Sequence, residues 1–162
     1  MPSQPSRVLV LGLGNDILTD DAVGLRIVAA ARTRLGAEPG IELQTTTEMG
    51  LALLDEISGH ENLVLVDAVQ TGRAPPGHLH ELGPDALSGP MQSAPHFLGI
   101  RETLELGRLL GLPMPGRVRI VAVEVTDPYT LGTELSPEVA AAVEGAADRV
   151  AALARELATS PT

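Results

Sequence analysis

The stretch Val8-Leu-Val-Leu-Gly-Leu-Gly-Asn-Asp-Ile-Leu-Thr-Asp-Asp21 decides the fold, because a buried strand, a tight turn and a helix start follow one another within it. Residues 8–13 form a continuous apolar run bounded by glycine, as in a strand that is buried on both faces of a parallel sheet. Apolar residues then recur at helical spacing from Val23 to Leu35. We expect Thr19 or Asp20 to cap this helix.

Strands and helices continue to alternate along the rest of the chain. Further strands are predicted at residues 41–45, 62–66 and 118–125, with an edge strand or hairpin arm at 78–82. Further helices are predicted at residues 51–57, at 97–110, and from Ser136-Pro137 to about Leu157, with the serine as cap and the proline in the first helical position. This alternation favours an α/β fold with parallel strands.

Composition limits the size of the protein and the classes of partner. A chain of 162 residues with 44% hydrophobic residues is long enough for one domain over residues 1–162, in which we expect 1–6 and 158–162 to be disordered tails. Because aromatic residues make up only 1%, the core must consist of Val, Leu, Ile and Ala. The formal net charge of -10 leaves no extended basic surface, so we expect no nucleic acid partner.

The sequence contains no cysteine, no signal-peptide core and no apolar stretch long enough to span a membrane. We therefore expect a cytoplasmic protein with no membrane partner. The lack of cysteine also removes disulfides, thiolate zinc sites and cysteine nucleophiles from consideration.

Two acids and one histidine fall where α/β sheets form ligand sites. Asp21 is predicted one turn into the first helix, Asp67 ends the strand at 62–66, and His96 begins the helix at 97–110. If the first and third strands are parallel neighbours, their carboxyl ends share one edge of the sheet and these side chains face one crevice. A helix N-terminus favours an ionised carboxylate at Asp21 and a neutral imidazole at His96. Two oxygens and one nitrogen suit zinc, nickel or manganese, so the pattern predicts an open metal site.

Three other features receive less specific interpretations. Residues 83–95 are rich in Pro, Gly and Ser, and they predict a mobile loop that leads to His96 and closes over a substrate. Glu48 follows the strand at 41–45 on the same sheet edge and is a candidate catalytic residue. His78 and His80 share one face of the edge strand and are expected to be a solvated pair.

Motif elimination leaves one alternative function. The turn Gly12-Leu13-Gly14 suggests dinucleotide binding, but the third glycine of the motif G-x-G-x-x-G would fall on Ile17. The alternative is therefore a non-catalytic α/β module that binds a small anion or nucleotide at this turn. The motifs of standard serine, cysteine and helix-borne zinc peptidases are absent from the sequence.

Four motifs resemble those of the nickel-iron hydrogenase maturation endopeptidases. Residues 10–24 are similar to the N-terminal signature of that family, in which G-x-G-N precedes an acidic pair and a glycine. Val64-Leu-Val-Asp67-Ala and Ser93-Ala-Pro-His96-Phe-Leu-Gly99 resemble the second and third motifs. Leu131-Gly-Thr-Glu-Leu-Ser-Pro-Glu-Val139 resembles the segment before the final helix, so the resemblance covers residues 7–153.

The resemblance implies a three-layer α/β/α sandwich around a twisted, mostly parallel sheet of about five strands, and we expect a monomer. Such enzymes are cytoplasmic and remove a short C-terminal extension from the precursor of a nickel-iron hydrogenase large subunit after nickel insertion. By this resemblance Asp21, Asp67 and His96 contact nickel that the substrate supplies on its own cysteines, and zinc or another divalent metal can occupy the site in vitro.

The same resemblance leaves the general base open between Asp21 and Asp67. Some members of the family carry an aspartate in a glycine-rich turn after the second strand, where this chain has Thr45-Thr-Thr47-Glu48. Either Glu48 substitutes for that aspartate or the mechanism proceeds without it.

Overall fold

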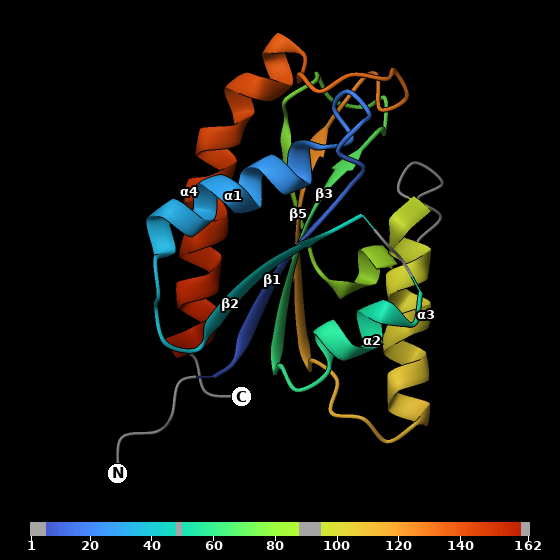
Figure 1. The fold of residues 1–162 in the computed structure, drawn as a ribbon, viewed down its shortest axis with the longest axis vertical. Helices are drawn as coiled ribbons and strands as arrows, with labels where there is room; N and C mark the ends of the chain where they lie inside the picture. The colour runs from blue at the N-terminus through green and yellow to red at the C-terminus, as the bar shows by residue number, and fades with distance from the viewer. Residues whose placement is uncertain (1–5, 48–49, 88–94, 160–162) are drawn as a thin grey trace.

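The chain forms one twisted five-stranded sheet between two layers of helices in a computed structural model that describes residues 6–47, 50–87 and 95–159 (Figure 1). The strands are β1 (Val8–Leu13), β2 (Ile41–Thr46), β3 (Asn62–Val69), β4 (Leu79–Leu82) and β5 (Arg117–Glu124). The helices are α1 (Val23–Leu35), α2 (Ala52–Ile57), the short 3-10 helix η1 (Pro84–Leu87), α3 (Pro95–Leu109) and α4 (Pro137–Thr159). The predicted α/β sandwich is confirmed.

The strand order is β2-β1-β3-β5-β4, and every neighbouring pair is parallel except β4 with β5. The first and third strands are therefore parallel neighbours, which is the condition that the sequence argument for the site required. The carboxyl ends of β1, β3 and β5 point to the same end of the molecule, which is the upper end in Figure 1. Loops far apart in the sequence meet there.

The two faces of the sheet are packed by different aliphatic residues. In β1 and β3 the valines at positions 8, 10, 64 and 66 pack against α1 and α4. The leucines at 9, 11, 63 and 65 pack against α2 and α3 on the other face. All of these side chains are fully buried, and each contributes about 1.5–3 kcal/mol to folding. Because successive side chains of a strand point to opposite faces, each apolar run supplies buried side chains to both faces of the sheet.

The beginning of α1 rests directly on the ends of two strands. A Cβ atom at Gly24 would lie 2.5 Å from the carbonyl oxygens of both Leu13 and Val66. A Cβ atom at Gly12 would lie 2.7 Å from the side chain of Val28. Glycine is therefore required at both positions by close approach, and this approach places the residues before α1 above the ends of β1 and β3.

The predicted cap of α1 is wrong. Ala22 occupies the cap position without a side-chain hydrogen bond, and neither Thr19 nor Asp20 takes that role. The Asp20 carboxylate is 1% exposed and instead accepts hydrogen bonds from the backbone N (2.8 Å) and Oγ (2.9 and 3.0 Å) of Ser136. It thereby ties the loop before α1 to the start of α4. Capping preferences describe only nearby residues and cannot reveal a partner 116 positions away.

Several predicted boundaries also shift. Because β3 runs to Val69, Asp67 lies within the strand and not after its end. Part of the predicted loop at 83–95 forms η1, and α3 begins at Pro95, while residues 88–94 lie outside the described part of the chain. Ser6 and Ala158, which the sequence assigned to disordered tails, are buried and joined by a 3.1 Å backbone hydrogen bond. None of the described helices has the length and apolarity needed to cross a membrane.

Two glycine substitutions should have opposite effects on stability, because only one of the two glycines lies where α1 contacts the strands. Gly24→Ala forces a methyl group against backbone carbonyls and should lower the free energy of unfolding by about 1–3 kcal/mol. Gly145→Ala in the exposed part of α4 meets nothing within 4 Å and should raise stability by about 0.5–1 kcal/mol. Urea unfolding measures both. A Gly24→Ala protein as stable as the Gly145→Ala protein would show that α1 does not require this close approach.

Candidate functional site

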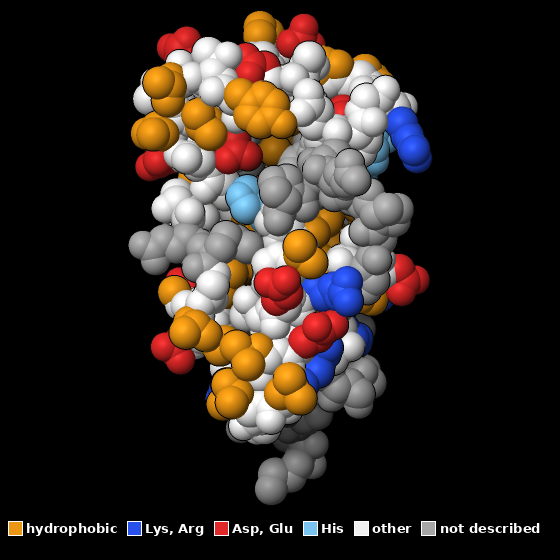
Figure 2. Space-filling view, turned by 90° about the vertical axis from the view of Figure 1, so that its right-hand side faces the viewer, with side chains coloured by type: hydrophobic (Ala, Val, Ile, Leu, Met, Phe, Trp, Pro, Cys, Tyr) orange, Lys and Arg blue, Asp and Glu red, His pale blue; other side chains and the backbone are white. Residues whose placement is uncertain are grey.

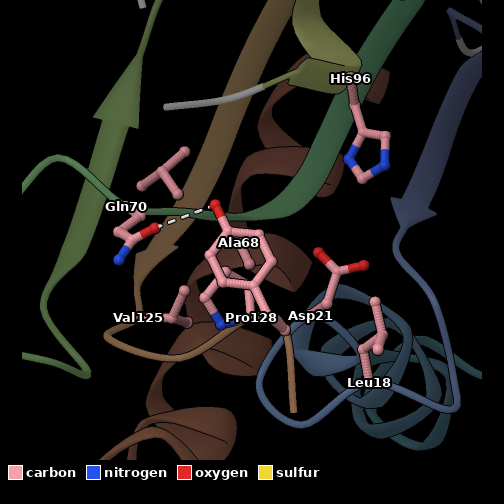
Figure 3. Close-up of a pocket in the computed structure, with 9 residues that line it drawn as sticks. Leu18, Asp21, Ala68, Gln70, His96, Val125 and Pro128 are labelled. Carbon is pink, nitrogen blue, oxygen red and sulfur yellow. Dashed lines mark hydrogen bonds between the residues drawn. The ribbon is translucent and has the colours of Figure 1, made fainter. Parts of the chain in front are cut away.

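Asp21, Asp67 and His96 come together at the carboxyl end of the sheet, as the sequence predicts. One potential ligand atom from each residue lies within 4.8 Å of the other two. Asp21 comes from the loop before α1, Asp67 from β3 and His96 from the first turn of α3. Figure 3 shows the side chains of Asp21 and His96 pointing toward one another across an opening. Two carboxylates and an imidazole at this separation can hold a divalent cation and leave positions open.

Asp67 is the most deeply buried residue of the three, and both of its carboxylate oxygens are hydrogen-bonded. Its side chain is fully buried, its Oδ1 accepts a hydrogen bond from the Ala68 backbone N (2.8 Å), and its Oδ2 lies 2.9 Å from His96 Nδ1. Burial raises the pKa of Asp67 because it disfavours the charged form, and the hydrogen bond from His96 opposes that rise. A buried charge of this kind requires an opposite charge beside it, which His96 supplies and a cation could also supply.

Asp21 is less buried and faces the opening. Its Oδ2 accepts a hydrogen bond from the backbone N of Asn15 at 2.9 Å, so the turn after β1 holds the carboxylate in place. Asp21 precedes α1 by two residues, whereas the sequence placed it one turn inside the helix. Partial burial raises its pKa, and the charge of His96 opposes the rise. The predicted stabilisation of its ionised form by the helix N-terminus is therefore outweighed.

The surroundings of His96 oppose the neutral imidazole that the sequence predicts. The helix N-terminus favours a neutral imidazole, but the hydrogen bond to Asp67 raises the pKa of His96, and the negative charges of Asp67 and Asp21 add to this effect. Burial acts in the opposite direction and is weaker. A cation entering the group would have to displace protons, because a metal ligand must be unprotonated.

Of the other predicted candidates, Glu48 lies outside the described residues. His78 and His80 do share a surface, with their rings edge to face at 4.8 Å. They are not merely a solvated pair, because His80 Nε2 donates a hydrogen bond to the buried carboxylate of Glu124 at 3.0 Å.

Glu124 is a polar residue of this sheet edge that the sequence analysis missed. It ends β5, is 2% exposed, and accepts hydrogen bonds from the backbone N atoms of Thr71 (2.8 Å) and Gly72 (3.2 Å) and from Thr71 Oγ1. Burial raises the pKa of Glu124, but these hydrogen bonds and the one from His80 outweigh burial and hold its pKa below the ordinary value. Glu124 carries the same sequence signal that identified Asp67, which is an acidic residue at the end of an apolar run.

The turn Gly12-Leu13-Gly14 does not form an anion cradle. A Cβ atom at Gly14 would lie 2.2 Å from the carbonyl oxygen of Asp21, and the space beside Gly12 is filled by Val28 and Gly24. Both glycines therefore let the chain pack against itself. This packing argues against the alternative of a nucleotide-binding module.

Comparison with known proteins identifies the family of this chain. Residues 25–153 match the family model described as hydrogenase maturation protease. The chain is 32% identical over 154 residues to the hydrogenase 2 maturation protease of Escherichia coli K12, covering 93% of this chain and 92% of that protein. The chain belongs to the hydrogenase maturation protease family, and it is accordingly a peptidase.

Solved structures show the same fold. The hydrogenase maturating endopeptidase HybD from E. coli superposes with a TM-score of 0.78 at 31% identity, over 93% of each chain. The NiFe hydrogenase maturation protease HybD from Thermococcus kodakarensis superposes with a TM-score of 0.72 at 27% identity, over 91% of this chain and 99% of that one. The resemblance of the sequence motifs is thus confirmed at the level of fold and family.

The hydrogen bonds of Glu124 predict a pH-dependent contribution to stability. Because its pKa is lowered in the folded protein, Glu124 stabilises the fold above its ordinary value of 4.5, and this contribution is lost as the pH falls through the lowered pKa. Glu124→Gln should cost about 1–3 kcal/mol at pH 7, and this difference from wild type should shrink toward pH 3. Urea unfolding at several pH values measures it, with the exposed Glu102→Gln as the control. A difference that is constant with pH would contradict the assignment.

Proposed function

We propose that this chain removes a C-terminal extension from the precursor of a nickel-iron hydrogenase large subunit after nickel has been inserted. The observation that carries the proposal is the convergence of Asp21, Asp67 and His96 within 4.8 Å in a member of this protease family. The nickel belongs to the substrate in this proposal, and the three side chains contact it there. Their oxygen and nitrogen donors suit nickel, and also zinc or another divalent metal in vitro.

The ligand atoms of these three side chains favour a metal ion that arrives bound to the substrate. Two carboxylates and one imidazole, partly open and without a thiolate, form a weaker site than a closed cysteine-rich one. The cysteines of the precursor would supply the remaining ligands, so that nickel joins the two proteins. Such a bridge would hold the cleaved peptide bond against the opening, which lowers the barrier by orientation.

The two carboxylates would then have different roles. Asp67 has both oxygens engaged, one by Ala68 and one by His96, and its side chain has no exposed surface. Asp21 borders the cavity beside the group. We propose Asp21 as the general base, because it can reach a water molecule in that opening and its raised pKa favours proton acceptance. The cytoplasmic location, the monomeric state and a role for Glu48 stay predictions.

Removing the charge of Asp67 should separate catalysis from folding. Asp67→Asn keeps the size of the side chain but loses a ligand, so processing of the precursor should fall about 100-fold. Burial makes the ionised form of Asp67 unfavourable and its hydrogen bond with His96 offsets part of that cost, so the variant should melt close to wild type at pH 7. Gel-shift assays of precursor cleavage and thermal melts measure the two effects. The exposed Asp55→Asn serves as control, and normal processing by Asp67→Asn would refute the site.

Nickel in the precursor should decide whether cleavage occurs. Matched samples of one precursor, loaded with nickel or left empty, should differ by at least about tenfold in cleavage rate, because only the loaded form can be bridged to the protease. The protease itself is supplied free of metal in both reactions. Equal cleavage of the two samples would overturn the bridging model and favour a peptidase that carries its own metal.

A further inference from the structure

A small apolar cavity opens directly beside the metal-binding group. It has a volume of about 190 Å³, room for ~6 water molecules or one side chain of moderate size. Its apolar wall consists of Leu18, Ala68, Val69, Val125, Pro128 and the ring of Tyr129. Asp21 and His96 line it on the side of the metal-binding group, as Figure 3 shows, so the cavity continues the site without interruption.

The polar side chain in the opposite wall is already engaged. Gln70 Nε2 donates a hydrogen bond to the carbonyl oxygen of Thr126 at 3.0 Å, and Gln70 Oε1 accepts one from the hydroxyl of Tyr129 at 3.4 Å, drawn as the dashed line in Figure 3. The charged groups that border the cavity, Asp21 and His96, lie at its end and belong to the metal-binding group. The rest of the wall offers a charged side chain no partner for its lost hydration, so an uncharged side chain is favoured there.

Tyr129 is the only tyrosine of the chain, yet it is 75% exposed. Its loop is held in place by the Asp127 carboxylate, which accepts hydrogen bonds from the backbone N atoms of Tyr129 and Thr130, both at 3.0 Å. The backbone of Thr130 in turn accepts a hydrogen bond from Thr19 N at 2.7 Å. An exposed aromatic side chain on a fixed loop is typical of a contact for a partner protein.

Two further exposed apolar residues lie on the loops that carry the lining residues Leu18 and Tyr129. Ile17 (56% exposed) and Leu131 (75%) lie on the paired loops, joined by a 2.9 Å bond from Gly132 N to the Ile17 carbonyl oxygen. We call Ile17, Tyr129 and Leu131 the apolar rim. Figure 2 shows hydrophobic side chains gathered at this upper end of the molecule, above a histidine. Exposed apolar residues that border a site mark a surface for interaction.

We propose that this cavity is a specificity pocket, which binds one uncharged aliphatic side chain of the precursor next to the peptide bond that is cleaved, while the apolar rim covers the neighbouring residues. The proposal rests on the proposed function. Its geometry commits to one occupant, because the cavity adjoins the group that would hold the nickel of the precursor and is too small for a folded segment.

The test varies the size of the substrate side chain and the size of the pocket. After the cleaved bond has been located by mass spectrometry of the product, each flanking residue of a nickel-loaded precursor is replaced in turn by Ala, Val, Leu, Phe, Lys or Asp. At one position, wild-type enzyme should favour Val or Leu over Ala, Lys and Asp by at least about tenfold in kcat/KM. Val125→Ala enlarges the pocket, and it should shift the preference at that position toward Leu or Phe.

Matched variants separate recognition from folding. Val150→Ala removes the same two methyl groups from a buried position in α4, outside the pocket, and should leave the preference unchanged. Tyr129→Ala should raise KM about tenfold for the preferred substrate with little change for the Ala substrate, whereas Tyr129→Phe keeps the ring and should behave like wild type. An effect of Tyr129→Ala on kcat alone would contradict a binding role.

The outcomes distinguish the two proposals. If wild-type enzyme cleaves the precursor but accepts Lys or Asp as readily as Val at every position, the pocket is refuted and the proposed function stands. An identical side-chain preference in wild type and Val125→Ala would also refute the pocket and leave the proposed function standing. If wild-type enzyme leaves every nickel-loaded precursor uncut, the proposed function is refuted and the pocket with it.

Discussion

The close approach of α1 to the ends of β1 and β3 is the constraint on which the rest of the structure depends. It requires glycine at positions 12 and 24, because any larger residue would meet the carbonyl groups or side chains of the neighbouring element. The short distance carries the loop before α1 over the sheet edge and brings Asp21 to Asp67. A helix packed farther out would leave the two carboxylates apart, and no site would form.

Electrostatics then set the charge balance of this edge. Burial raises the pKa of Asp67, and the hydrogen bond to Asp67 raises the pKa of His96 against the effect of its own burial. A cation that enters this group would therefore compete with protons for the same side chains. Glu124 differs from Asp67, because hydrogen bonds from the turn at residues 71–72 and from His80 satisfy its carboxylate and hold its pKa below the ordinary value.

Local sequence reasoning succeeded where the physical cause was local. Apolar runs located β1, β3 and β5, because a strand buried on both faces has few polar positions. Ser136-Pro137 correctly marked the start of α4. The same reasoning failed for Asp20, whose partner is Ser136, and it missed that Asp67 raises the pKa of His96 against the effect of its helix. It also stopped β3 too early, since a carboxylate within a buried strand is acceptable only when a partner on another element satisfies it.

The sequence by itself determined the order of strands and helices and which three residues are candidates for the site. Each of these follows from hydrophobic periodicity, from the rule that parallel strands end at one edge, or from a run of motifs. Only the tertiary structure decided how far Asp67 is buried, that Asp67 raises the pKa of His96 and that an apolar pocket adjoins the candidate site. Those properties depend on distances between elements that lie far apart in the chain, and no local pattern encodes such distances.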